Sequence, residues 1–403
     1  MIEDAWRYFA PGGALMPGGP STWHILDWDQ RRIIAYYGRK HIDALGPDVY
    51  AIHLSPNGNL ISVSTNPEDD ETFSVHHPSL EEVQRPGWVQ TVSRSELREQ
   101  ERLSPNVDLM SYVPFEGAEP RKVVFKKYYF LVQFFERRWD EMNLWMRLCP
   151  HPNIVQFDRL VVDKLDNDLV VVGFTSLYIP GGTIAENKSR VFKLEWLKQL
   201  TAVVDDMNLK HGIMHQDIAA RNLLVDPKTD AILLFDFNYS ARIGGVEYSK
   251  TRDDVKGVIF TLYEIITGDE HFRDIPHEEQ STEEIEALDE WVKHPGVSLD
   301  HPVAEYRSVL NHWVKQRREG GQITSYTEAL EYIDWPAPEG PPSQGYTYKD
   351  EEGNSVTIPF PSWANSRRSR REIGRTFLNW QRPLQTKIRD GTCVLATGEV
   401  LDS

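Results

Sequence analysis

The stretch that decides the fold is residues 211–225, which read His-Gly-Ile-Met-His-Gln-Asp-Ile-Ala-Ala-Arg-Asn-Leu-Leu-Val. A short apolar strand follows, and it ends in Asp-Phe at residues 236 and 237. Phosphoryl transfer from ATP needs one carboxylate to orient a hydroxyl and another to hold Mg²⁺, and an amide oxygen can complete the metal shell. Asp217, Asp236 and Asn222 provide these groups. The pattern therefore predicts a nucleotide-dependent phosphoryl-transfer site.

The order His-x-Asp-x-x-x-x-Asn, a turn, and a strand ending in Asp-Phe resembles the catalytic and metal-binding loops of the protein-kinase-like superfamily. The Ala-Ala-Arg-Asn run after the aspartate is most similar to the catalytic loop of tyrosine kinases. The resemblance implies that ATP and Mg²⁺ bind here. It implies that Asp217 orients the acceptor hydroxyl and that Arg221 offsets developing negative charge. Asn222 and Asp236 are the implied metal ligands.

Two upstream segments resemble the parts of a kinase that steady the ATP phosphates. The tetrapeptide Val-Val-Phe-Lys ending at Lys126 is similar to the strand motif V-A-I-K, which implies that Lys126 contacts the α- and β-phosphates. Lys127 is the alternative. Glu141 lies ten residues before a His-Pro-Asn-Ile-Val run that starts at His151, and in kinases this run follows the helix whose glutamate pairs with the lysine. Glu136 is the alternative glutamate.

The resemblance also implies which residues surround adenine. The run Tyr-Ile-Pro-Gly-Gly-Thr at 178–183 is similar to the kinase hinge. Backbone groups around Leu177 and Ile179 are therefore expected to bind adenine, with Ser176 at the gate to the rear pocket. The floor and the roof of the adenine site are assigned to Leu224 and Val124.

Further landmarks are structural. Asp254 leads into the apolar run 255–266, where kinases have a buried helix whose first aspartate braces the catalytic loop. Asp253 is the weaker candidate for that role. The rings expected to stack into an apolar column belong to Trp145, His215 and Phe237.

The sequence departs from the kinase pattern before the lysine strand and within the catalytic loop. Between Val107 and Lys122 the only glycine is Gly117, so no glycine-rich turn is available to bring backbone amides close to phosphates. Gln216 replaces the arginine that normally answers a phosphate on the activation loop. We therefore expect no control by such phosphorylation.

The segment after Asp236 departs as well. Asn238 replaces the usual glycine, a mild change because asparagine tolerates left-handed backbone geometry better than other non-glycine residues. Only 18 positions separate Asp236 from Asp254 (254 − 236 = 18), and no Ala-Pro-Glu motif lies between them. A groove for an extended peptide is therefore doubtful, and a small-molecule acceptor or an unusual polypeptide gains support.

Composition limits the partners and the surroundings. The 403 residues, 40% of them hydrophobic, can form two or three units with buried cores. There are 61 acidic and 44 basic residues, and the net charge of −17 disfavours a general attraction to nucleic acid or anionic membranes. The two cysteines, Cys149 and Cys393, cannot form a disulfide framework. No apolar stretch approaches the roughly 20 residues of a membrane span. We expect a soluble, reduced, cytoplasmic protein with no membrane partner.

The texture of the chain, together with the resemblance, predicts an α+β, bilobal, protein-kinase-like fold with a β-rich N-lobe and an α-rich C-lobe. The expected parts are a β-rich extension (1–95), the N-lobe (96–180), the C-lobe (181–336), and a Pro/Gly-rich linker with a basic tail (337–403). Helical segments are expected at about 133–148, 191–209 and 255–266, and strands at 154–157, 160–162 and 169–174. The basic run Arg367–Arg371 is expected to dock on the protein's own surface or to be solvated, with a local site for an acidic partner or RNA as the alternative.

The function expected from these observations is that of an atypical kinase that transfers the γ-phosphoryl group of ATP to a hydroxyl on a protein or a small molecule. Two other hypotheses stay open. A pseudokinase or binding scaffold accounts for the missing glycine-rich turn. A kinase-like fold recruited to adenylyl or acyl transfer accounts for the two unassigned flanks.

Overall fold

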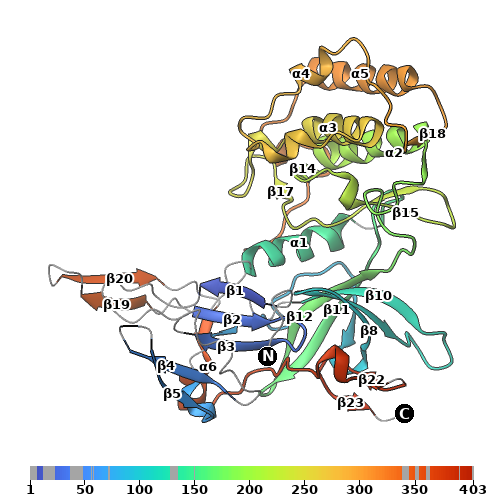
Figure 1. Ribbon diagram of the computed structural model, residues 1–403. Helices are drawn as coiled ribbons and strands as arrows, with labels where there is room; N and C mark the ends of the chain where they lie inside the picture. The colour runs from blue at the N-terminus through green and yellow to red at the C-terminus, as the bar shows by residue number, and fades with distance from the viewer. Residues whose placement is uncertain are drawn as a thin grey trace. The chain divides into compact units, whose positions relative to one another are not determined.

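The structure is a computed structural model with an α+β fold (Figure 1). It describes residues 7–11, 23–36, 49–55, 57, 59–70, 73–127, 135–148, 150–337, 345–349, 354–359, 364–389 and 391–401. The chain divides into two compact units. Unit 1 comprises residues 1–136, 158–176 and 337–403, and unit 2 comprises residues 137–157 and 177–336. Cys149 and most of the expected Pro/Gly-rich linker lie outside the described residues.

Unit 1 is built on a six-stranded mixed sheet with the strand order β7-β11-β12-β10-β9-β8. The strands are β7 (Gln90–Ser93), β8 (Arg98–Ser104), β9 (Val107–Tyr112), β10 (Arg121–Lys127), β11 (Phe157–Leu165) and β12 (Asp168–Leu177). β8, β9 and β10 form an antiparallel meander, whereas β7 pairs with β11 in parallel. The turn between β8 and β9 contains only Pro105 and Asn106.

The alternation along β10 separates two sets of side chains. Val123, Phe125 and Lys127 are fully buried on one face of the sheet, and Val124 and Lys126 therefore lie on the other. The neighbouring strand β12 carries Gly173 beside this segment. A Cβ atom on Gly173 would lie 2.2 Å from the carbonyl oxygen of Lys126, so only glycine permits this approach of the two backbones.

The apolar core of unit 1 draws on residues far from the sheet in sequence. Leu378, Trp380 and Ala396 belong to the same buried cluster as Val123 and Phe125. The backbone continues this packing, because Ala396 N–H donates to the Leu97 oxygen (2.8 Å). The C-terminal segment thus forms part of the core.

Buried charges attach the N-terminal residues to the same sheet. Arg31, Lys127 and Arg382 all pair with the carboxylate of Asp108, which is completely buried. Burial alone would raise the pKa of Asp108, but the three cations outweigh it and hold the pKa well below its usual range. Burial lowers the pKa of Lys127 well below its usual value.

The remaining strands of unit 1 form smaller sheets. The first is a five-stranded sheet of β1 (Arg7–Pro11), β2 (Trp23–Asp27), β3 (Arg32–Tyr36), β4 (Ala51–Leu54) and β5 (Leu60–Ser64). Three pairs complete the set: β6 (Phe73–Val75) with β21 (Ala364–Ser366), β19 (Gly345–Lys349) with β20 (Ser355–Pro359), and β22 (Cys393–Val394) with β23 (Val400–Leu401). The short helix α6 (Arg367–Glu372) contains the basic run. Arg367 pairs with Asp70 (3.4 Å), so this run docks on the protein's own surface as expected.

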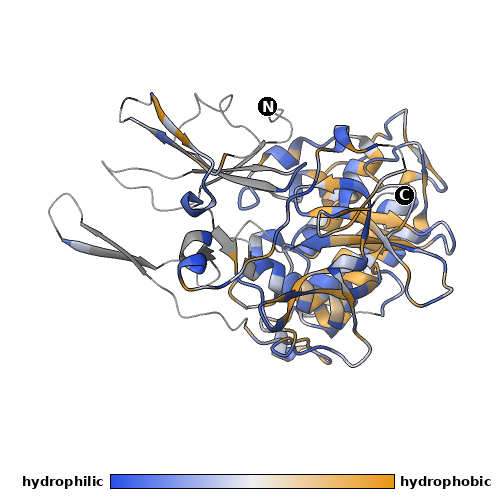
Figure 2. Ribbon diagram, turned by 90° about the horizontal axis from the view of Figure 1, so that it is seen from below, coloured by the Kyte–Doolittle hydropathy of each residue, from blue (hydrophilic) through white to orange (hydrophobic). Residues whose placement is uncertain are grey.

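Unit 2 is mainly helical. Its helices are α1 (Phe135–Leu148), α2 (Leu194–Asp205), α3 (Asp254–Thr267), α4 (Glu283–Glu286) and α5 (Val303–Glu319). Helices α2, α3 and α5 pack against one another (Figure 1). Figure 2 shows that the helices contain both hydrophobic and hydrophilic residues. Short strand pairs join them: β13 (Val191–Phe192) with β18 (Ser298–Leu299), β14 (Ile213–Met214) with β17 (Ala241–Arg242), and β15 (Leu223–Val225) with β16 (Ile232–Leu234).

Local chemistry sets the ends of the buried helix α3. The side chain of Asp253 accepts a hydrogen bond from Lys256 N–H and caps the N-terminus. Gly268 ends the helix in the left-handed conformation with φ 71°. Within the described residues, no helix combines the length and the apolar content needed to cross a membrane.

Candidate active site

The ladder between β15 and β16 brings two of the expected metal ligands to the same end of a strand pair. Leu223 pairs with Leu234, so Asn222, just before β15, lies beside the residues that follow β16. Phe235 N–H donates to the Asn222 oxygen over 3.2 Å. Asp236 comes next and has a positive φ of 66°, which is uncommon for a residue other than glycine. The positive-φ residue Asp236 thus comes directly after Phe235, whose backbone is hydrogen-bonded to Asn222.

The carboxylate of Asp217 is held from both sides. Asn222 Nδ2 donates to Oδ2 of Asp217 and to its backbone oxygen, each over 2.8 Å. Arg221 Nη2 donates to Oδ1 over 2.5 Å. The Asp217 side chain is 9% exposed, whereas that of Arg221 is 55% exposed. These hydrogen bonds hold the Asp217 carboxylate in one orientation.

Asp254 braces the backbone of the loop, as the sequence predicted. Its Oδ2 accepts hydrogen bonds from His215 N–H (2.7 Å) and Asn208 Nδ2 (2.9 Å), and its Oδ1 accepts one from Gln216 N–H (2.8 Å). Burial raises the pKa of Asp254, although His215 and the three donors partly offset that effect. The alternative, Asp253, caps helix α3 instead.

The three aromatic rings expected to form a column are in contact in series. The ring centroids of Trp145 and Phe237 are 5.1 Å apart, and those of His215 and Phe237 are 5.2 Å apart. Both pairs meet edge to face, an arrangement that aromatic rings favour. The column joins helix α1 to His215 in the loop that contains Asp217, and to Phe237, the residue after Asp236.

Gln216 cross-links the segment that follows Asp236. Its Nε2 donates to the backbone oxygens of Tyr239 (2.6 Å) and Glu247 (3.0 Å), and its Oε1 accepts from Ser249 N–H (2.5 Å). Gln216 itself has a φ of 64°. The neutral amide of Gln216 therefore anchors this segment by hydrogen bonds to its backbone. In the kinase pattern an arginine occupies this position.

The predicted residues on β10 and β12 belong to unit 1. Lys126 is 5% exposed and shares its face of β10 with Val124. Lys127, the alternative lysine, lies on the other face and binds Asp108. Ser176 is buried at the end of β12.

The other predicted residues belong to unit 2. Glu141 is fully buried on α1 and accepts a hydrogen bond from Arg138 Nη1 (2.7 Å), while the Glu136 side chain is outside the described part. Leu177 N–H donates to the Gln156 oxygen (3.0 Å). The segment that follows Ile179 reaches the catalytic loop, because Thr183 pairs with Leu224.

The groups around Asn222 fit a magnesium ion. Both hydrogens of Asn222 Nδ2 are directed at Asp217, which leaves the amide oxygen to act as a ligand. Asp236 adds a carboxylate, and Mg²⁺ usually takes one or two protein carboxylates together with phosphates and water. Among the described residues, no group of three or more His, Cys, Asp or Glu side chains could hold a metal by itself.

Sequence reasoning missed Asn208 and the cross-links of Gln216. Asn208 lies in a single π-helical turn, Asp206–Lys210, between α2 and β14, and it receives a hydrogen bond from Arg317 Nη2 (3.0 Å). No local pattern in the sequence marks such a turn, although π-helical turns are frequent at functional sites. Neither the protein-family models nor the curated proteins include a match to this chain.

Proposed function

We propose that this chain is a phosphotransferase with a bilobal, protein-kinase-like fold that moves the γ-phosphoryl group of ATP to a hydroxyl acceptor. One observation carries the proposal: Asp217 and Asn222 share a side-chain hydrogen bond, and the backbone oxygen of Asn222 accepts one from Phe235, the residue before Asp236. Asp254 holds the backbone of this loop in place. The division of the chain into a sheet-based unit with Lys126 and a helical unit with Asp217 supports the same proposal.

In the proposed mechanism, Asn222 Oδ1 and the Asp236 carboxylate would hold Mg²⁺, and Leu224 would contribute to the adenine site. Bound Mg²⁺–ATP supplies the transferable phosphoryl group. Asp217 orients the acceptor hydroxyl and takes its proton at Oδ2, because Arg221 already neutralises Oδ1. Arg221 stays close enough to offset negative charge that develops at the acceptor oxygen.

The acceptor is proposed to be a hydroxyl on a small molecule or a polypeptide. The segment after Asp236 is short, and Gln216 anchors it at residues 239, 247 and 249. This anchoring supports an acceptor other than an extended peptide laid along that segment.

A binding scaffold without turnover is the second candidate. The observation that favours it is the tight turn at Pro105 and Asn106. The backbone oxygen of Asn106 accepts a hydrogen bond from Lys127 N–H (3.0 Å). A turn without glycine offers fewer backbone amides to phosphates.

The test is calorimetric titration of ATP with and without Mg²⁺, followed by a turnover assay that separates ADP from AMP. We expect metal-dependent binding that Asp236→Ala abolishes. Asp217→Asn is expected to keep binding and to lose turnover. The exposed Asp274→Ala is the matched control on the same unit. Binding without turnover would favour the scaffold, AMP release would favour adenylyl transfer, and absence of ATP binding would overturn the proposal.

A further inference from the structure

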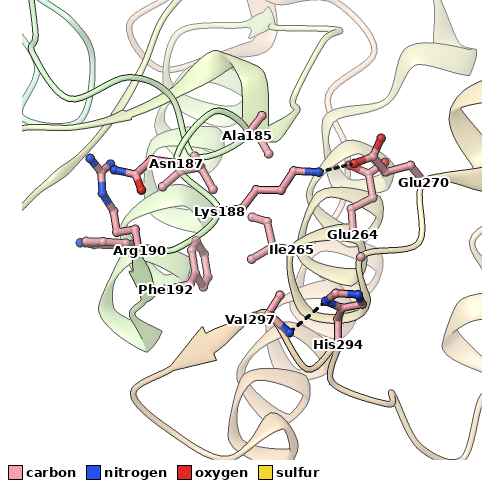
Figure 3. A pocket seen from close by; sticks show the side chains of 15 residues that line it. Ala185, Asn187, Lys188, Arg190, Phe192, Glu264, Ile265, Glu270, His294 and Val297 are labelled. Carbon is pink, nitrogen blue, oxygen red and sulfur yellow. Dashed lines mark hydrogen bonds and ion pairs between the residues drawn. The ribbon is translucent and has the colours of Figure 1, made fainter.

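Unit 2 contains a cavity of about 270 Å³ beside the catalytic loop (Figure 3). It is lined by the loop 184–190, by Phe192 of β13 and Trp196 of α2, and by the C-terminal end of α3. The volume is at the lower end of the range for small-molecule sites, which suits a ligand about as large as one aromatic ring with a short side chain.

One part of the wall is apolar. Phe192 and Trp196 are nearly fully buried, and their ring centroids are 5.7 Å apart. Trp196 Nε1 already donates to the Asp230 oxygen (2.8 Å), so its indole presents an apolar surface. Ile265 of α3 faces the same space in Figure 3. An apolar ring is therefore the natural occupant of this part of the cavity.

Most charges that line the cavity are already compensated. Lys188 and Glu270 form an ion pair (3.3 Å) that joins the loop to the end of α3, and both side chains are largely exposed. An exposed pair of this kind contributes little to stability, so a ligand can displace it. Glu264, deeper in the wall, is bound by Arg273.

Arg190 is the exception. Its Nη2 donates to the Gly181 oxygen (3.1 Å), and its Nη1 is buried without a hydrogen-bond partner. In the described part of the chain, no carboxylate forms an ion pair with Arg190. Arg190 as a whole is only partly buried and lines the cavity, so a carboxylate there would form a charge-assisted bond with the accessible side of its guanidinium. A single uncompensated cation matches a ligand with a single negative charge.

The cavity adjoins the residues of the candidate active site. Ala220, which precedes Arg221, lines it, and Ala185 N–H of the cavity loop donates to the Ala220 oxygen (3.2 Å). Burial raises the pKa of Glu264 in the cavity wall, and Arg273 and, more weakly, Arg221 partly offset that rise. The cavity loop and the loop that holds Asp217 are thus joined by a backbone hydrogen bond.

We propose that this cavity binds a small organic monocarboxylate with an apolar, ring-sized body, whose carboxylate pairs with Arg190 and whose ring lies against Phe192, Trp196 and Ile265. The proposal goes beyond phosphoryl transfer, because neither Asp217 nor a nucleotide takes part in it.

The probes are 3-phenylpropanoate and its neutral isostere 3-phenylpropanamide, each titrated into the full-length protein by calorimetry. We expect the acid to bind about tenfold or more tightly than the amide, since a charge-assisted hydrogen bond exceeds the 1.4 kcal/mol that corresponds to a factor of ten. Arg190→Gln is expected to remove that preference. Arg307→Gln, a matched arginine on this unit that donates to main-chain oxygens of Asp289 and Leu288, is expected to retain it.

Two further variants complete the test. Ile265→Trp, which fills the cavity from α3, is expected to block both probes. Asp217→Asn is expected to leave probe binding unchanged, so a failure of this site is distinguishable from a failure of phosphoryl transfer. Equal binding of acid and amide, unchanged selectivity in Arg190→Gln, or no binding of either probe up to its solubility limit would overturn the proposal.

Discussion

Asp253 and Asp254 are neighbours with different roles, and replacing each by asparagine separates them. In Asp254→Asn, an amide donor would face the N–H groups of His215 and Gln216, which now donate to a carboxylate. We expect this variant to lower the free energy of unfolding by about 3 kcal/mol, because hydrogen bonds to buried charged groups are costly to lose. Urea denaturation measures this. Asp253→Asn is the control, since asparagine caps helices as well as aspartate does, and equal losses in both variants would contradict the assigned roles.

His77 gives unit 1 a defined sensitivity to acid. Burial first, and then the nearby Arg94, lower its pKa from 6.5 to about 3. Below pH 6.5, His77 is protonated in the unfolded chain but stays neutral in the folded protein. The free energy of unfolding therefore falls as the pH drops from 6.5 toward 3, and above pH 6.5 it does not depend on His77. Between pH 6.5 and 5 the loss is about 2 kcal/mol.

The measurement is the pH dependence of urea denaturation for the wild type and for His77→Gln. The variant is expected to lose this component of the slope. The exposed His312→Gln serves as the control. Parallel pH profiles for the wild type and His77→Gln would show that His77 is not responsible.

At the residue scale, the sequence predicts the partners that short spacing brings together. Asp217 and Asn222 are five residues apart on one loop, and Asp254 was predicted as its brace. The backbone conformation was less accessible: asparagine at 238 suggested left-handed geometry there, but the residue with positive φ is Asp236. Hydrogen bonds to residues distant in sequence determine which residue adopts the strained, positive-φ conformation. A local sequence pattern does not reveal those bonds.

At the scale of elements, Gly257 lets helix α3 approach the catalytic loop. A Cβ atom at this position would lie 2.9 Å from Cβ of Ile218, the residue after Asp217. Gly257→Ala gains about 1 kcal/mol of helix propensity but meets an overpacking cost of about 1–3 kcal/mol. We expect net destabilisation and reduced turnover, measured by urea denaturation and by ADP release. Gly87→Ala is the control, since no atom lies within 4 Å of a Cβ there, and a more stable, fully active Gly257→Ala would refute the close approach.

The cross-links of Gln216 predict how firmly the loop 239–249 is held. Gln216→Ala removes three hydrogen bonds between this side chain and the loop: two that Gln216 donates and one that it accepts from Ser249 N–H. We expect faster hydrogen exchange of its amides, by about tenfold or more at Ser249, because opening then breaks one bond fewer. Mass-spectrometric exchange measures this, with the exposed Gln316→Ala as the control. Unchanged exchange would mean that β17 alone holds the loop.

Helices with their own start and stop signals could be predicted, and those that depend on distant partners could not. The expected run 255–266 is α3 to within about a residue at each end, because Asp253 and Gly268 mark it. The expected helix 191–209 is instead β13, α2 and a π-helical turn. Leu194 N–H is capped by the side chain of Asp300, about a hundred residues away, and that cap fixes where α2 begins. Similarly, the strand expected at 154–157 begins only at Phe157, in β11.

At the scale of the molecule, Arg382 joins both ends of the chain to the sheet of unit 1. Its Nη1 donates to Glu99 (2.7 Å) and Asp108 (3.1 Å), and its Nε donates to the backbone oxygen of Asp29 (2.6 Å). Arg382→Met leaves these groups buried without that partner, and we expect a loss of about 3–5 kcal/mol in stability. Thermal and urea denaturation measure it. Arg389→Met, on an exposed residue of the same segment, is the control, and similar stabilities in the two variants would refute the role of the cluster.

This joining of the flanks was beyond sequence analysis. Residues 1–95 and 337–403 contain no motif that pairs one with the other, and the arginines and aspartates of the cluster look like ordinary surface charges in sequence. Their burial depends on contacts such as Arg31 with the Ala396 oxygen, which span most of the chain. Local sequence patterns indicate only contacts between residues that are close along the chain, so they do not predict contacts between residues hundreds of positions apart.

The shared core of unit 1 also fixes an order of events during protein synthesis. A ribosome makes residues 177–336, with the helices and the candidate active site, before it makes Leu378, Trp380 and Arg382. Until these residues leave the exit tunnel, the sheet lacks part of its apolar cover and Asp108 lacks one of its counterions. We therefore expect the unit that begins first in translation to be the last to finish folding, with its apolar strands exposed until then.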